Sequence, residues 1–222
     1  MTALLRYQAA LLLGSHRALP PVILYAAWLA VGVQIGNPLL ATLGYAAGGL
    51  LPAAAWLTRI CVTNEPPAAR DCAAAAAGPE RAHLAAVLTA AGTTLLLALP
   101  GVALVTLLSE PRSNDHQVAV PVLPAAVAGL LTALACLLMG VAIGALSSRP
   151  VLRSAAWGIP VSLTAAVLLL ALSPSPVNAA LSGMVTGSVS GTVHTPWLPA
   201  AATALLAAAA TAAACALTAR RS

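Results

Sequence analysis

Residues 120–146, VPVLPAAVAGLLTALACLLMGVAIGAL, contain no charged side chain. This run is longer than the roughly 20 apolar residues that a helix needs to cross a bilayer. The chain contains five more long apolar runs, three before this one and two after it. They are continuous rather than alternating at the period of two that marks a membrane β-barrel. The sequence therefore predicts an all-α integral membrane protein.

The composition of the whole chain agrees with that prediction. Its 222 residues are 60% hydrophobic and 7% charged, whereas soluble domains carry about 25% charged residues. The mean hydropathy is +0.95, and a soluble domain of this size could not bury so much apolar surface. All ten basic residues are Arg. Because a Walker A loop needs a Lys, the chain cannot hydrolyse ATP by that route alone.

The runs predict one transmembrane domain with six spans. An N-terminal segment, residues 2–18, comes first; Arg6 and Arg17 share one helical face and leucines gather on another. We expect this amphipathic helix to lie in the membrane interface. The expected spans are residues 20–36, 39–61, 83–108, 120–146, 155–172 and 197–217.

The arginines predict the orientation of these spans. With six spans and a cytoplasmic N-terminus, nine of the ten Arg lie inside and only Arg112 lies outside. A five-span alternative, with a re-entrant helix at Pro100-Gly101, gives six inside and four outside. We therefore expect a multi-pass protein of the bacterial cytoplasmic membrane with both termini in the cytoplasm. This bias explains the net charge of +5 without nucleic acid as a partner. Arg59, at the end of the second span, is able to snorkel to the interface.

A polar segment, TNEPPAARDCAAAAAGPER at residues 63–81, separates the second and third spans. It predicts a helix over residues 64–78, with Asn64 as its N-cap and Glu65 at the favourable N-terminus. Gly78 and the proline after it end this helix. Joining two neighbouring helices needs far fewer residues. The extra helix indicates either docking to a partner or an interfacial segment that covers lipid headgroups.

A second unusual segment, residues 173–196, lies between the last two spans and carries no formal charge. Its apolar residues are interspersed with Gly, Ser and Thr. It fits a re-entrant or interface-lying helical segment, which membranes tolerate where it packs on protein. An ordinary flexible loop is the alternative.

No catalytic or metal site is predicted. The four His fall at four different ends of the predicted spans, and all five acidic residues fall in loops. Metal sites and proton relays need such groups to cluster or to lie within spans. The four Cys are interpreted as free thiols. The spans carry mainly hydroxyl groups, which suits a bulky apolar or amphipathic substrate better than an ion. The pair Gly140 and Gly144 indicates close helix packing, within one subunit or between two.

The order of these elements resembles a known family. An elbow helix precedes two spans, a cytoplasmic helix follows, and a long extracellular segment separates the last two spans. This organisation resembles the membrane subunit of a type-2 ABC exporter over essentially the whole chain. The stretch RICVTNEPPAARDCAAAAAGPERAHLA, residues 59–85, is similar in style to small actinobacterial ABC permeases.

The resemblance implies roles for particular segments. Residues 2–18 would be the connecting helix, and residues 173–196 would close the pathway on the outside. Residues 64–78 would be a coupling helix that sits in a groove of the ATPase subunit. Its expected ATPase contacts are Asn64, Glu65, Arg70 and Asp71. Spans 39–61 and 155–172 would line the pathway at a dimer interface. The candidate lining residues are Thr42, Tyr45, Ser162 and Thr164.

The resemblance also implies partners. Two six-span subunits, identical or related, would pair with an ABC ATPase dimer in the lipid bilayer. ATP and Mg²⁺ would bind to the ATPase, so this chain would hold no cofactor and would not be an enzyme. Two rivals remain. A vitamin-binding component of an energy-coupling-factor importer would need a more polar pocket. A solitary membrane-embedded enzyme would need carboxylates or clustered His within its spans.

Overall fold

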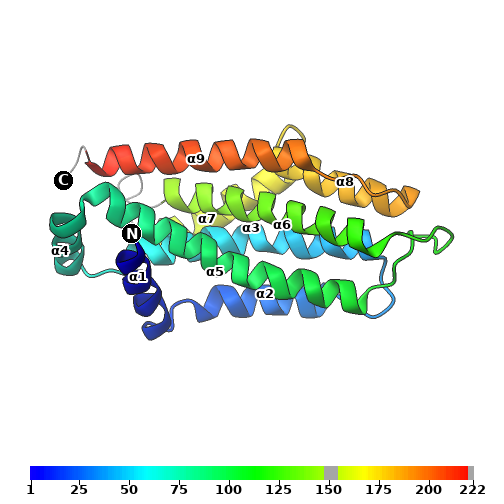
Figure 1. The fold of residues 1–222 in the computed structure, drawn as a ribbon, viewed down its shortest axis with the longest axis horizontal. Coiled ribbons are helices and arrows are strands. Elements are labelled where there is room, and N and C mark those ends of the chain that lie inside the picture. The colour runs from blue at the N-terminus through cyan, green and yellow to red at the C-terminus, as the bar shows by residue number, and fades with distance from the viewer. Residues whose placement is uncertain (148–154, 220–222) are drawn as a thin grey trace.

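The computed structural model describes residues 1–147 and 155–219, and these form nine α-helices in an elongated bundle (Figure 1). The predicted all-α architecture is confirmed for this part of the chain. Arg149, Arg153, Arg220 and Arg221, which contributed to the predicted orientation, lie outside it. In chain order the helices are α1 (Thr2–Gly14), α2 (Leu19–Gly32), α3 (Leu39–Thr63), α4 (Pro67–Ala77), α5 (Pro79–Leu108), α6 (Val122–Leu146), α7 (Ala155–Ala171), α8 (Pro176–Ser190) and α9 (Trp197–Ala219).

Four of these helices, α3, α5, α6 and α9, are long and apolar enough to cross a membrane. The pair α7 and α8 adds a fifth span if it is one helix broken at its 51° bend. With 14 residues, α2 rises only about 21 Å, less than the ~30 Å hydrocarbon core. The helices are therefore those of a membrane-embedded protein with four or five spans by length and composition. The number of six stays a prediction.

The centre of the bundle is α3, on which no residue from Leu39 to Val62 is exposed. It crosses α6 at very short range because α6 presents Gly140 and Gly144. A Cβ atom on Gly140 would lie 2.5 Å from the carbonyl oxygen of Leu51, and one on Gly144 would lie 2.7 Å from that of Ala55. Small residues permit this close approach. This glycine pair therefore serves packing within the chain rather than between subunits.

The short helix α2 is held against α3 by an aromatic contact. The rings of Trp28 and Tyr45 stack with centroids 4.5 Å apart and planes 6° apart. The indole Nε1 of Trp28 also donates a hydrogen bond to the backbone oxygen of Tyr45 at 2.9 Å. Gly32 leaves room for the Tyr45 ring, which a Cβ atom there would overlap. These contacts hold the Tyr45 ring between α2 and α3.

The segment predicted as re-entrant or flexible contains the regular helix α8. Its start is tied to the end of α7, since Nδ2 of Asn178 donates a hydrogen bond to the Leu170 oxygen at 2.7 Å. Further along, Met184 packs on α3, where a Cβ atom at Gly44 would lie 3.2 Å from it. A helix over residues 176–190 therefore replaces the flexible-loop alternative.

Arg59 near the end of α3 is buried within the bundle instead of extending along its surface. The residue is only 6% exposed, and its Nη1 donates a hydrogen bond to the Ser147 oxygen at 2.7 Å. Gly158 of α7 packs against the guanidinium group. The free carbonyls at the end of a helix carry partial negative charge, and the missing side chain at Gly158 makes room. Arg59 thus joins the ends of α3 and α6 and the beginning of α7.

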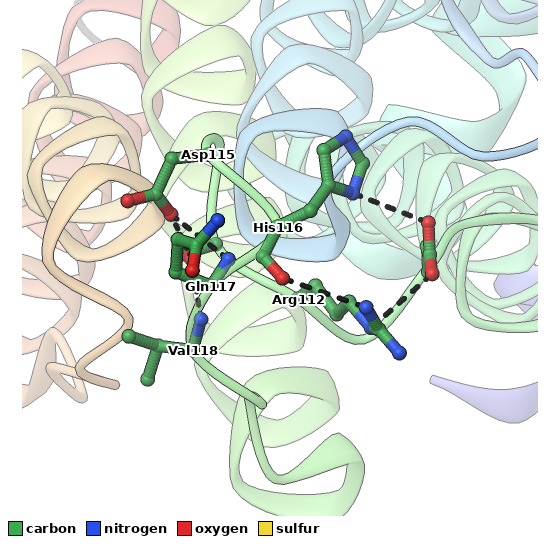
Figure 2. Close-up of polar contacts among 7 residues, drawn as sticks. Arg112, Asp115, His116, Gln117 and Val118 are labelled. Carbon is green, nitrogen blue, oxygen red and sulfur yellow. Dashed lines mark hydrogen bonds and ion pairs between the residues drawn. The ribbon is translucent and has the colours of Figure 1, made fainter.

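The two ends of the bundle differ. At one end lie α1, α4 and the end of α9, whereas the loop between α5 and α6 lies at the other (Figure 1). This loop is an ordered polar cap. The carboxylate of Glu110 lies 3.3 Å from Arg112 Nε through Oε1 and 3.3 Å from His116 Nδ1 through Oε2. The Asn114 N–H donates to the Ser188 oxygen of α8 at 2.8 Å. Figure 2 shows Arg112 and His116 side by side in it.

We expect this loop to loosen in acid because of Asp115. The hydroxyl of Ser113 and then the backbone N–H of Gln117 hydrogen-bond to its carboxylate and lower its pKa (Figure 2). Since the pKa is lower in the folded state, this stabilisation is fully present above the ordinary value of 3.8. It is lost as pH falls through the lowered value. Protease cleavage in the loop should therefore rise as pH is lowered from 5 to about 2.5.

The Asp115→Asn variant should remove that pH dependence. Asp71→Asn, at an exposed position on α4, serves as the control and should leave it unchanged. Pepsin, which is active in acid, is the suitable protease. Equal pH profiles for the Asp115 variant and the unaltered protein would contradict the assignment.

Candidate functional site

The connection between α3 and α4 differs from the prediction in its first turn. The helix begins at Pro67, and Asn64 is instead the C-cap of α3. The predicted N-cap role of Asn64 is therefore wrong. A residue that precedes proline is forced into extended backbone, and Pro66 has φ −58° and ψ 147°. The predicted end is confirmed, because Gly78 ends α4 with a φ of 89°.

Asn64 turns towards the N-terminal helix α1. Its Nδ2 donates hydrogen bonds to the Leu11 oxygen at 3.1 Å and to Ser15 Oγ at 3.2 Å. Both acceptors lie at the C-terminal end of α1, where the Leu11 oxygen also accepts the hydrogen bond of the capping Ser15 N–H. Asn64 therefore docks α1 onto the linker that leads into α4.

Glu65 is buried against the same helix, with 6% of its surface exposed. Gln8 Nε2 of α1 donates a hydrogen bond to Glu65 Oε2 at 3.3 Å, and the Tyr7 hydroxyl of the same helix also hydrogen-bonds to the carboxylate. Burial, and then the neighbouring Glu65 carboxylate, raise the pKa of Tyr7 above its ordinary value. Glu65 therefore belongs to the α1 interface of the linker.

Arg70 and Asp71 lie in the first turns of α4 and differ in their surroundings. Arg70 is half-buried and folds back, so that its Nη2 donates a hydrogen bond to the backbone oxygen of Glu65 at 3.1 Å. Asp71 and its neighbour Cys72 are exposed. Four residues were predicted to contact the ATPase. Asn64 and Glu65 face α1, Arg70 hydrogen-bonds to the linker, and Asp71 is exposed. No residue of α4 is buried.

His83 is a further residue of this junction, and no role was predicted for it. It lies in the second turn of α5 with 9% of its surface exposed, and its Nε2 has no partner among the described residues. It interacts electrostatically with Arg70. The sequence gives only a weak signal for this role, because a single His at the start of an apolar run is also typical of a residue at the membrane interface. Glu65 and His83 are thus two buried polar groups that flank α4 in the chain, and of these His83 keeps a ring nitrogen without a hydrogen-bond partner among the described residues.

The predicted lining residues lie apart from this junction. Thr42 and Ser162 are buried and donate to carbonyl oxygens of their own helices, from Pro38 and Ile159. Thr164 is exposed on α7 and donates to the Pro160 oxygen. Tyr45 is half-buried beneath Trp28. The structure does not bring the four together at one cavity, and their pathway role stays a prediction.

Two apolar hollows lie on the sides of the bundle. One, of about 560 Å³, runs between α5 and α9 and has Glu80 and Arg81 at one end. The other, of about 390 Å³, lies at the break between α7 and α8. In residues 1–147 and 155–219, no three His, Cys, Asp or Glu side chains are grouped so that they could hold a metal ion. The Cys residues at 61, 72, 136 and 215 are free, as predicted.

Comparison of the chain with protein-family models, with curated proteins and with solved structures finds no match. The arrangement at the α4 end of the bundle therefore has to indicate the function. Its main feature is an unburied helix held at one end of a membrane bundle. The polar linker that precedes that helix, with its buried Glu65, is the second feature.

Proposed function

We propose that the chain is the membrane subunit of an ATP-driven exporter of the ABC type. A second copy or a related subunit would complete the membrane part, and an ABC ATPase dimer would bind ATP and Mg²⁺. The observation that carries the proposal is α4, a helix of 11 residues with none buried. It lies at the end of the bundle (Figure 1), and in the chain it separates the two long apolar helices α3 and α5. A connection of that length is unnecessary for joining α3 to α5.

The linker supports a role in which α4 moves together with the bundle. Asn64 and Glu65 tie the linker to α1, and Arg70 ties α4 to the linker. The linker continues directly into α3, the central helix, whose Arg59 contacts α6 and lies against α7. A push on α4 by closing ATPase subunits would thus be applied to the core of the bundle. ATP can shift its conformation only if the two states differ in ATPase contact.

The charges support a cytoplasmic position for α4. Of the Arg residues that the structure describes, Arg112 lies in the polar cap, whereas Arg6, Arg70 and Arg81 lie on or next to α4 and α1. Arg and Lys are enriched on the cytoplasmic side of membrane proteins. This bias supports an orientation in which α4 faces the cytoplasm of a bacterium, the compartment that would hold the ATPase.

The test is co-purification in mild detergent from the native membrane, with mass spectrometry of the recovered proteins. We expect an ATPase with Walker motifs. The double variant Asp71→Arg and Ala75→Glu changes one exposed face of α4 and should lower ATPase recovery at least tenfold. Arg112→Glu at the opposite end is the matched control and should leave recovery unchanged. A photo-cross-linker on exposed Cys72, in a Cys215→Ala background, should join the chain to the ATPase.

Two results would contradict the proposal at different levels. Full ATPase recovery with the α4 variant would place the contact elsewhere and remove the coupling role of α4. Recovery of only the chain itself, as a stable monomer or oligomer, would favour a solitary membrane enzyme or channel.

A further inference from the structure

The apolar cavity at the break between α7 and α8 has the volume of a ligand site. Its volume is about 390 Å³, in the lower part of the ~300–1,000 Å³ range of small-molecule sites. Its walls include Met139 and Ile143 of α6, Leu169 of α7 and Ala210 of α9. Broken helices that line a cavity recur at substrate sites of membrane transporters.

The cavity opens sideways, onto the outer surface of the bundle. Leu146, Leu172 and Leu206 lie on its rim and are between 42% and 50% exposed. In a membrane that surface faces lipid, so an occupant would enter from the bilayer. The rim residues are apolar, and an apolar chain can therefore pass them without losing hydration.

One polar group interrupts this apolar lining. Ser175 is 5% exposed and lines the cavity, and its hydroxyl has no partner among the described residues. It occupies the N-cap position of α8 but makes no capping hydrogen bond. Serine at this position ordinarily bonds to a backbone N–H of the first turn. A buried hydroxyl without a partner is costly, so this group is available to a ligand.

The first turn of α8 adds positive potential beside that hydroxyl. The backbone N–H groups of a helix's first turn lack helical acceptors and carry partial positive charge. Pro176 has no N–H, so Val177 and Asn178 contribute the first ones. The side chain of Asn178 is occupied by the Leu170 oxygen. A hydroxyl donor and a helix N-terminus together favour a hydrogen-bond acceptor such as a carbonyl oxygen.

The charge of the ligand follows from the rest of the lining. No charged side chain is present among the described residues of the cavity. An ionised carboxylate or phosphate would be buried here without a paired cation, which is strongly unfavourable. A neutral head group avoids this cost. The small volume admits one chain rather than the two of a phospholipid.

We propose that this cavity binds a neutral single-chain amphiphile, whose head-group carbonyl accepts a hydrogen bond from Ser175 and whose chain lies along α6 and α9. Binding of this kind needs neither an ATPase nor a second subunit. The proposal therefore goes beyond the proposed function and can fail or hold independently of it.

The test uses the full chain in lipid nanodiscs and a monoacylglycerol that carries a diazirine in its acyl chain. Irradiation should label peptides of α6 and α9 saturably, and unlabelled monoacylglycerol should compete. The Ser175→Ala variant should weaken the monoacylglycerol probe roughly fivefold, the value of one hydrogen bond. A diazirine alkane of equal length should bind both proteins alike. Ser182→Ala, at an exposed position on the same helix, is the matched control and should change nothing.

Two further measurements separate ligand binding from a structural role. Ser175→Ala should raise the thermal midpoint of the unliganded protein, because it removes an unpaired buried hydroxyl. Ala210→Leu should fill the cavity and abolish labelling by both probes, whereas Ala208→Leu, at an exposed position of α9, should not. The proposal is overturned if alkane and monoacylglycerol bind the unaltered protein equally, if a diazirine fatty acid binds best, or if Ser175→Ala lowers the midpoint as loss of a cap would.

Discussion

Replacing Gly140 with isoleucine should prevent the bundle from forming, and replacing it with alanine should lower the free energy of unfolding by about 1–3 kcal/mol. A Cβ atom at this position would lie 2.5 Å from the Leu51 carbonyl oxygen and 2.6 Å from the Ala54 Cβ atom. The obstacle is largely backbone of the central helix, which cannot rotate away as a side chain can. Relief requires α3 and α6 to separate along their whole contact.

The measurement is the monodisperse fraction in detergent for the isoleucine variant and the unfolding midpoint for the alanine variant. Two matched controls are Gly48→Ala in α3 and Gly92→Ala in α5, since an added Cβ atom meets nothing within 4 Å at either. Both should be neutral or slightly stabilising, because alanine favours a helix over glycine. Equal midpoints for Gly140→Ala and Gly48→Ala would show that α3 and α6 are not in close contact.

Replacing Arg59 with methionine should lower the free energy of unfolding by about 1.5–3 kcal/mol, the value of a hydrogen bond to a charged group. The guanidinium donates to the Ser147 oxygen at 2.7 Å in a buried environment. Methionine preserves much of the side-chain volume, so the loss reports the polar contact rather than a cavity. The end of α6 would then keep a buried carbonyl without this donor, and α7 would lose its contact with the guanidinium.

The unfolding midpoint measures this effect, and limited proteolysis should show earlier cleavage near Ser147. Arg59→Lys keeps the charge and should recover part of the stability. Arg17→Met removes an exposed arginine nearby and should cost little. If the Arg59→Met variant were as stable as the Arg17→Met variant, the contacts of Arg59 with α6 and α7 would contribute nothing to the free energy of unfolding. The route proposed for coupling α4 to the bundle would then be lost as well.

Much of the helical framework is readable from residue order. The apolar run over residues 120–146 appears as α6 from Val122, and the run over 39–61 appears as α3, two residues longer. Gly78 and Pro79 end α4 where predicted. These features depend on hydrophobicity, helix propensity and proline geometry, all of which act within a few residues. The contacts of the candidate site could not be predicted from the sequence. Asn64 and Glu65 turn towards α1, which is more than 40 residues away in sequence.

The amino-acid sequence alone therefore establishes a membrane-embedded helical chain, the existence of a polar helix between two apolar ones, and the lack of a Walker lysine. Which faces meet, and which polar groups are buried, required the folded structure. Most helices here are rich in alanine and apolar on every side, so no stripe marks the inward face. Close backbone approach at Gly140 and Gly144 selects that face instead. The inward turn of Arg59 and the unpaired hydroxyl of Ser175 also required the folded structure, because each depends on helices distant in sequence.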